Sequence, residues 1–89
     1  MNKKLLTKAI ETFGVETQLK KTAEECSELI KAVLKPQTVT DITIEIADVL
    51  IMIAQLQIIF GISDRTIEAT ILEKCHRLED LIDQKNKNA

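Results

Sequence analysis

Aromatic side chains are nearly absent from this sequence. Among 89 residues there is no Trp or Tyr, and the two Phe residues are Phe13 and Phe60. Single-stranded nucleic acids are bound by stacking bases on aromatic rings, and duplexes are bound by an excess of Lys and Arg. That excess is missing too, since the formal net charge is −2. The sequence therefore predicts no nucleic-acid partner.

Signals for disulfides, export and membranes are also missing. Cys26 and Cys75 lack the spacing of a zinc site or a disulfide framework, so we expect reduced thiols. The start MNKKLL leads straight into polar residues, without the apolar core of a signal peptide. The apolar run 46–60 contains Asp48 and Gln55, and it is too short and too polar for a membrane span. We expect a cytoplasmic protein with no membrane partner.

Helix-breaking residues are few: Pro36, Gly14 and Gly61 are all that the chain contains. They divide it into four segments, and no linker or repeat separates domains, so residues 1–89 are predicted to form a single domain. Apolar residues recur at helical spacing in most of these segments. The predicted fold is all-α, an antiparallel four-helix bundle with helices at about 3–13, 16–35, 38–60 and 63–85.

The third segment carries conflicting signals. VTDITIEI, at the start of it, alternates and is rich in β-branched residues, which is typical of a strand. The absence of Gly and Pro from residue 37 to residue 60 favours one long helix, which Thr38 caps with Asp41 in its first turn. We expect the helix.

The apolar content is high for so short a chain. Apolar residues make up 45% of the sequence, whereas a domain of this size buries only about 60% of the surface that its unfolded chain exposes. We therefore expect self-association as a homodimer or homotetramer, which completes the bundle.

Two carboxylates lie in the most apolar segment. In a helix, Glu45 and Asp48 share one stripe while the other faces are apolar, which is typical of a buried helix. A buried carboxylate is unfavourable unless a cation or several hydrogen-bond donors accompany it. One interpretation is an ion pair with Lys or Arg from a neighbouring helix.

The second segment offers a matching pair in AEECSEL. Glu25 and Glu28 are three residues apart, so their side chains point in similar directions on a helix. Taken alone they resemble a solvated face, with Lys21 and Lys31 placed to form ion pairs. Two antiparallel helices would instead bring both acidic pairs to one point. Because His and Cys are absent from this set, it predicts a Mg²⁺ site, with Mn²⁺ as the alternative.

These motifs resemble those of a known family. EECSE (24–28), followed by EIAD (45–48), resembles the EExxE…ExxD signature of MazG-like, all-α nucleoside triphosphate pyrophosphohydrolases. FGVETQLKKTAEECSELIKA and EKCHRLEDLI also look like the compact phage-type and Gram-positive members. The resemblance spans residue 13 to about residue 77.

The resemblance implies hydrolysis of (deoxy)nucleoside triphosphates to the monophosphate and pyrophosphate. It implies that Mg²⁺ is held by Glu25, Glu28, Glu45 and Asp48, with Glu24 orienting the attacking water. Residues expected at the substrate are Lys74 and Arg77, which match a KxxR pattern, Lys21, and Gln18 near the base or sugar. An alternative interpretation of Lys74 and Arg77 is that they form surface ion pairs with Glu73 and Asp80.

Two other functions fit the sequence. One is a non-catalytic, oligomerising helical bundle that acts as an interaction or regulatory module. This interpretation explains the apolar excess but gives Glu45 and Asp48 no role. The other keeps the metal site and uses it only to bind a nucleotide.

Overall fold

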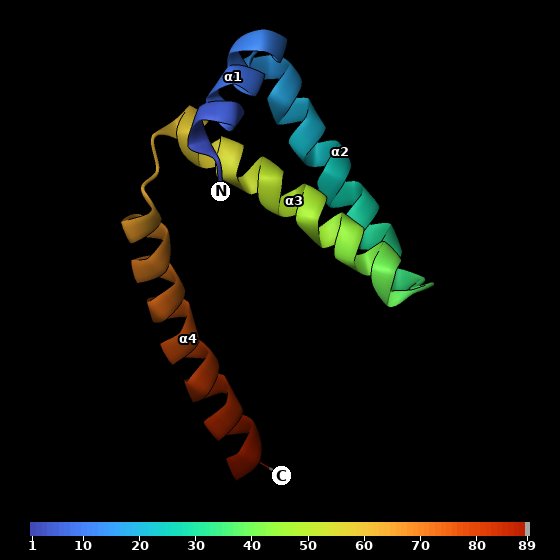
Figure 1. Ribbon diagram of the computed structural model, residues 1–89. Helices are drawn as coiled ribbons and strands as arrows, with labels where there is room; N and C mark the ends of the chain where they lie inside the picture. The colour runs from blue at the N-terminus through green and yellow to red at the C-terminus, as the bar shows by residue number, and fades with distance from the viewer. Residues whose placement is uncertain (89) are drawn as a thin grey trace.

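The computed structural model describes residues 1–88 and contains four helices (Figure 1). They are α1 (Lys3–Phe13), α2 (Val15–Leu34), α3 (Val39–Phe60) and α4 (Asp64–Lys87). No strand occurs between residues 1 and 88. The all-α prediction is confirmed, and the helix bounds agree closely with the predicted segments.

Polar N-cap side chains fix where three of the helices begin. The side-chain oxygens of Asn2, Thr38 and Ser63 accept hydrogen bonds from the backbone N–H three residues on, at 3.0, 3.1 and 3.1 Å. Each bond satisfies one of the N–H groups that a helix leaves unpaired at its start. The predicted caps Thr38 and Ser63 are confirmed.

The third segment is a helix despite its strand-like start. Within its first turns the Thr43 hydroxyl donates to the Val39 carbonyl at 2.7 Å, so a β-branched residue is accommodated by bonding back to the helix. The helix runs unbroken to Gly61, whose φ of 65° lies in the left-handed region that glycine adopts without strain. Capping and the lack of breakers therefore outweigh local strand propensity.

The core forms where α1 and α2 pack against α3 (Figure 1). α2 runs antiparallel to α3 along much of its length, and α1 lies across one end of the pair. The buried apolar side chains are Leu6 and Ile10 of α1 and Val49 and Met52 of α3. This small core joins α1 to α3, whereas the buried residues of α2 are polar. The acidic residues lie on α2 and α3, which pack along each other.

The fourth helix projects away from the other three (Figure 1). None of its described residues is buried. The radius of gyration is 16.5 Å, compared with about 12 Å for a compact domain of this length. The predicted four-helix bundle is thus not closed by one chain: α1, α2 and α3 pack together, and α4 remains unpacked.

Polar contacts set the direction of α4 at its junction with α3. The Gln57 amide donates to the Asp64 carboxylate at 2.9 Å and to the Ile62 carbonyl at 3.4 Å. The Lys3 amino group lies 3.9 Å from the same Asp64 carboxylate. These contacts are exposed, so no packed core supports the junction.

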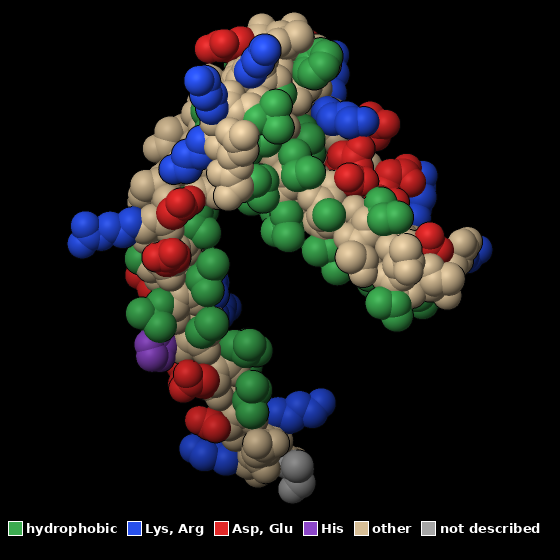
Figure 2. Space-filling view, in the orientation of Figure 1, with side chains coloured by type: hydrophobic (Ala, Val, Ile, Leu, Met, Phe, Trp, Pro, Cys, Tyr) green, Lys and Arg blue, Asp and Glu red, His purple; other side chains and the backbone are tan. Residues whose placement is uncertain are grey.

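Large apolar areas remain exposed on α3 and α4. Figure 2 shows hydrophobic side chains along the sides of the two helices that border the open space between them. The exposed side chains include Ile46, Leu50 and Ile53 of α3 and Ile71, Leu78 and Ile82 of α4. By length and composition alone, α3 is also apolar enough to cross a membrane. The absence of a membrane partner therefore stays a prediction, based on the polar residues of α3.

Two matched substitutions on α3 test the position of the core. Val49 is 8% exposed and Val39 is 83% exposed. Val49→Ala should lower the free energy of unfolding by about 2 kcal/mol, because two buried methyl groups are lost. Val39→Ala should change it by less than about 0.5 kcal/mol. Urea unfolding followed by circular dichroism at one protein concentration measures both, and equal effects would contradict this core.

Candidate metal centre

The antiparallel packing of α2 on α3 brings three acidic side chains together. Glu25 from α2 and Glu45 and Asp48 from α3 each offer one carboxylate oxygen, and these oxygens lie within 4.8 Å of one another. All three residues are half-buried at the boundary between the helices. The expected convergence of the two acidic pairs is therefore observed for three of their four members.

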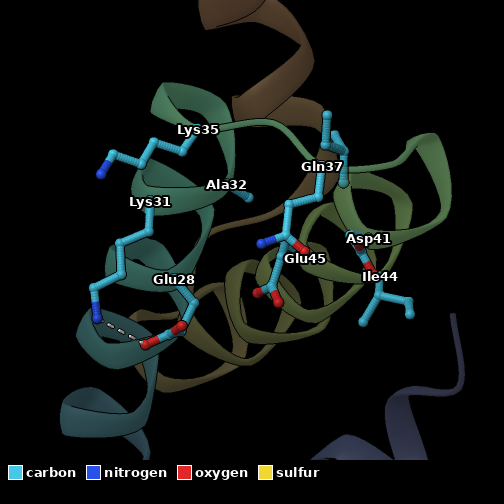
Figure 3. Close-up of a pocket in the computed structure, with 9 residues that line it drawn as sticks. Glu28, Lys31, Ala32, Lys35, Gln37, Asp41, Ile44 and Glu45 are labelled. Atoms are coloured by element: carbon cyan, nitrogen blue, oxygen red, sulfur yellow. Dashed lines mark hydrogen bonds and ion pairs between the residues drawn. The ribbon is translucent and has the colours of Figure 1, made fainter.

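The fourth acid, Glu28, lies beside this cluster. Its side chain is exposed and pairs with Lys31, whose amino group is 3.3 Å from the carboxylate. Glu28 and Glu45 line the same pocket (Figure 3). The charge of Glu28 is also among those that raise the pKa of Glu45. Glu28 is thus an electrostatic neighbour of the cluster, held by a lysine of its own helix.

Lysines of α2 partly balance the acids of α2. Lys21 lies 3.1 Å from Glu25, one helical turn away, so the ordinary ion-pair interpretation holds for both Glu25 and Glu28. The hydrogen bond to Glu25, followed by the charge of Glu24, raises the pKa of Lys21, which therefore stays cationic.

Glu45 and Asp48 have no such partner. Between residues 1 and 88 no Lys, Arg or His forms an ion pair with either of them. The four acids and the two lysines carry a formal charge of −2, which one divalent cation neutralises.

The carboxyl group of Glu45 is the least satisfied polar group of the site. Its Oε2 atom is buried and has no hydrogen-bond partner. Burial is the largest cause of the raised pKa of Glu45, followed by the charge of Asp48 and then by those of Glu28 and Glu25. Because buried polar atoms almost always have a partner, this oxygen fits a cation as its partner.

The donor set fits Mg²⁺ or Mn²⁺. All donors are carboxylate oxygens, which these hard cations prefer. Two oxygens on opposite sides of one Mg²⁺ lie about 4.2 Å apart. Since the three oxygens already lie within 4.8 Å of one another, small side-chain movements bring them into binding distance.

Gln18 lies on the same helix interface as the acids. It is buried, and its amide donates to the Gln55 amide oxygen at 2.7 Å. In this chain Gln18 therefore contacts α3. The predicted contact with a base or sugar stays a prediction.

Three other predicted site residues lie outside the cluster. Glu24 is exposed beside Glu25 on α2, and its charge acts on Lys21. Lys74 and Arg77 are exposed on α4, which does not pack against α2. The structure of one chain therefore does not bring these two cations to the acids.

An open pocket of about 460 Å³ is lined by two of the four acids, Glu28 and Glu45. In Figure 3, Glu45 lies between Lys31 and Lys35 on one side and Asp41 and Ile44 on the other. The pocket also includes Gln37. The sequence did not predict Lys35 and Gln37 at the site, because they lie in the turn between α2 and α3, and turns have no periodicity that places their side chains.

Comparison with known proteins gives one family. The family model described as the MazG nucleotide pyrophosphohydrolase domain matches residues 13–85. This range contains all five acids of the EExxE…ExxD pattern as well as Lys74 and Arg77. Comparison with curated proteins and with solved structures finds no match.

The raised pKa of Glu45 predicts how pH affects the metal-free protein. The folded state keeps the Glu45 proton to a higher pH than the unfolded chain, whose carboxyl has the ordinary pKa of 4.5. Stability from this group is therefore present at low pH and is lost as pH rises through the folded-state pKa. Glu45→Gln removes that loss, so this variant should melt at a higher temperature than the wild type at pH 7 in EDTA.

Glu16→Gln is the matched control. Glu16 is an exposed acid of α2 that pairs with Lys20 at the helix surface. The melting temperature of the Glu16→Gln variant should therefore stay near that of the wild type. Melting curves are compared at one protein concentration. A Glu45→Gln variant that melts below the wild type at pH 7 would show that this carboxylate is well accommodated without a metal.

Proposed function

Because the chain belongs to the MazG nucleotide pyrophosphohydrolase family, we propose that it hydrolyses (deoxy)nucleoside triphosphates to the monophosphate and pyrophosphate with Mg²⁺. Mn²⁺ is the alternative ion. The observation that carries the proposal is the buried, unpartnered Glu45 oxygen inside a cluster of three carboxylates. A surface ion-pair network would not leave that oxygen without a partner.

Glu25, Glu45 and Asp48 are proposed to hold the metal. Glu28 joins them when its carboxylate leaves Lys31. A bound Mg²⁺ supplies positive charge to the phosphate oxygens and lowers the pKa of a water molecule. Lys21 remains paired with Glu25 and keeps that carboxylate oriented toward α3.

The remaining roles concern water and substrate. The oxygen of a water molecule attacks the α-phosphorus, this water releases a proton to the solvent, and the bond from that phosphorus to the bridging oxygen breaks. Pyrophosphate leaves with the electron pair of that bond. Glu24, exposed next to Glu25, is proposed to orient the water. Lys31 and Lys35 lie at the pocket beside the acids and offer positive charge to the phosphate chain.

The functional unit is proposed to be a homodimer or homotetramer in the cytoplasm, without nucleic acid. The support is the exposed apolar surface of α3 and α4, which a second copy would bury (Figure 2). In such an assembly, Lys74 and Arg77 reach the acids of another copy, because α4 projects away from the acids of its own chain. Self-association thereby supplies both the missing packing and the missing cations.

The exposed apolar faces also favour a second candidate, a non-catalytic module that assembles through α3 and α4. It leaves the buried Glu45 oxygen unexplained. A site that binds nucleotides without hydrolysis shares the metal but gives no products. Product analysis distinguishes these functions.

The activity test uses a panel of dNTPs and NTPs with Mg²⁺. The wild type should release pyrophosphate and the monophosphate, detected by ion-exchange chromatography. Glu45→Gln should lower the rate at least about 100-fold, because even groups that only orient metal ligands change activity 10- to 100-fold. Glu16→Gln, an exposed substitution of the same type, should keep the rate within about twofold.

The outcomes separate the three functions. Release of pyrophosphate that survives Glu45→Gln would contradict the proposed site. Binding of nucleotide and Mg²⁺ without product would indicate a binding protein. If no nucleotide is bound or hydrolysed and Mg²⁺ does not change the melting temperature, the protein would be the non-catalytic module.

Subunit mixing tests whether α4 acts across the interface. Glu45→Gln lacks a working acidic cluster, and a Lys74→Ala/Arg77→Ala variant lacks the cations, so each should be nearly inactive alone. Unfolded together and refolded as a mixture, they should regain about a quarter of wild-type activity, because half of a dimer population is mixed and each mixed dimer has one intact site. If α4 serves its own chain, the mixture stays inactive.

A further inference from the structure

The interface between α2 and α3 contains a line of polar residues. Gln18, then Glu25, follow one face of α2, and Gln55, then Asp48, follow the facing side of α3. α3 is apolar on most of its other faces. Burial of apolar surface is non-directional, so it favours several alignments of α2 on such a helix almost equally. Another interaction has to select one of them.

The Gln18–Gln55 contact has the properties needed. The two side chains are 6% and 3% exposed, and the Gln18 amide donates to the Gln55 oxygen at 2.7 Å. The Gln55 amide also lies 3.6 Å from the Met52 sulfur. In residues 1–88 no other side-chain hydrogen bond or ion pair joins α2 to α3. Separating two buried amides leaves both unsatisfied, so any other alignment is penalised.

The alignment of Gln18 with Gln55 also determines where the acids of the two helices lie, because each Gln is at a fixed spacing from an acid on its own helix. Glu25 follows Gln18 by seven residues, and Asp48 precedes Gln55 by seven residues. Seven residues are about two helical turns, which keeps all four side chains at the interface. A slip of one turn moves α2 by about 5.4 Å along α3. This displacement exceeds 4.8 Å, the distance within which the three carboxylate oxygens lie of one another. A slip of one turn would therefore separate Glu25 from Glu45 and Asp48.

We infer that Gln18 and Gln55 are positioning residues: their buried amide pair fixes the register of α2 on α3 and so brings Glu25 to Glu45 and Asp48. The inference rests on the proposed function in that it gives the register a purpose, the metal site. In coiled coils a buried polar residue selects the register at the expense of stability, which apolar residues at the same position do not do.

The first test measures the register directly and needs no metal. Spin labels are placed at the exposed positions 16 and 47 of a Cys26→Ala/Cys75→Ala chain, diluted with unlabelled protein so that one chain is measured. Pulsed electron resonance should give one narrow distance distribution. Adding Gln18→Met/Gln55→Met should broaden it or shift it by about 5 Å, one helical turn.

The second test measures metal binding and stability together. The Gln18→Met/Gln55→Met variant should bind Mn²⁺ at least about tenfold more weakly, because the acids no longer share one register. Its melting temperature should equal or exceed that of the wild type, since both amides are replaced by apolar groups of similar size. Ile10→Leu, a buried apolar exchange on α1, outside the two helices that carry the amide pair, should keep Mn²⁺ affinity within about twofold.

The outcomes are distinct. An unchanged distance distribution in the double Met variant would overturn the inference, whatever happens to the metal. A shifted distribution in a protein whose wild type binds no Mn²⁺ would support the register role and overturn the proposed metal function. A merely structural pair would lower the melting temperature and leave Mn²⁺ affinity unchanged, which would also overturn the inference.

Discussion

Antiparallel contact between α2 and α3 is the constraint on which the structure depends. It forms most of the packing, and it carries every acid of the candidate centre. The contact combines two buried apolar side chains of α3, Val49 and Met52, with a polar line that runs from the Gln18–Gln55 amide pair to the carboxylates. Alignment and chemistry thus come from the same interface.

Charge at this interface is balanced unequally between the two helices. α2 provides its own lysines, so Glu25 and Glu28 have cationic partners without a metal. α3 provides none, and the Glu45 oxygen is left buried without a donor. The metal-free protein therefore carries its unfavourable electrostatic energy on α3, the helix with the most exposed apolar side chains. This is an arrangement that a bound cation stabilises.

Much of the fold follows from local signals in the sequence. Gly14, Pro36 and Gly61 mark the helix ends, and Thr38 and Ser63 cap the following helices as predicted. These features depend on a few neighbouring residues, so short-range pattern analysis finds them. The acidic pairs were also predictable, because three-residue spacing places both members on one side of a helix.

Other features depend on long-range geometry and were not predictable. The amide pair joins residues that no periodicity connects, and Lys35 reaches the pocket through the path of a turn. The direction of α4 was likewise not predictable. Apolar spacing shows which face of a helix packs against other residues, but not whether those residues belong to the same chain or to another molecule. Gln57 and Asp64, which set that direction, form polar contacts that leave no regular pattern in the sequence.

The junction between α3 and α4 has a mechanical consequence. The side-chain contacts of Gln57, Asp64 and Lys3 at this junction are all exposed, and no described residue of α4 is buried, so a change in the angle between α3 and α4 disrupts little packing. A helix of 24 residues is about 36 Å long, so a rotation of about 10° at its base displaces its tip by about 6 Å. Small changes of backbone angle at Gly61 and its neighbours therefore produce displacements that grow toward the far end of α4.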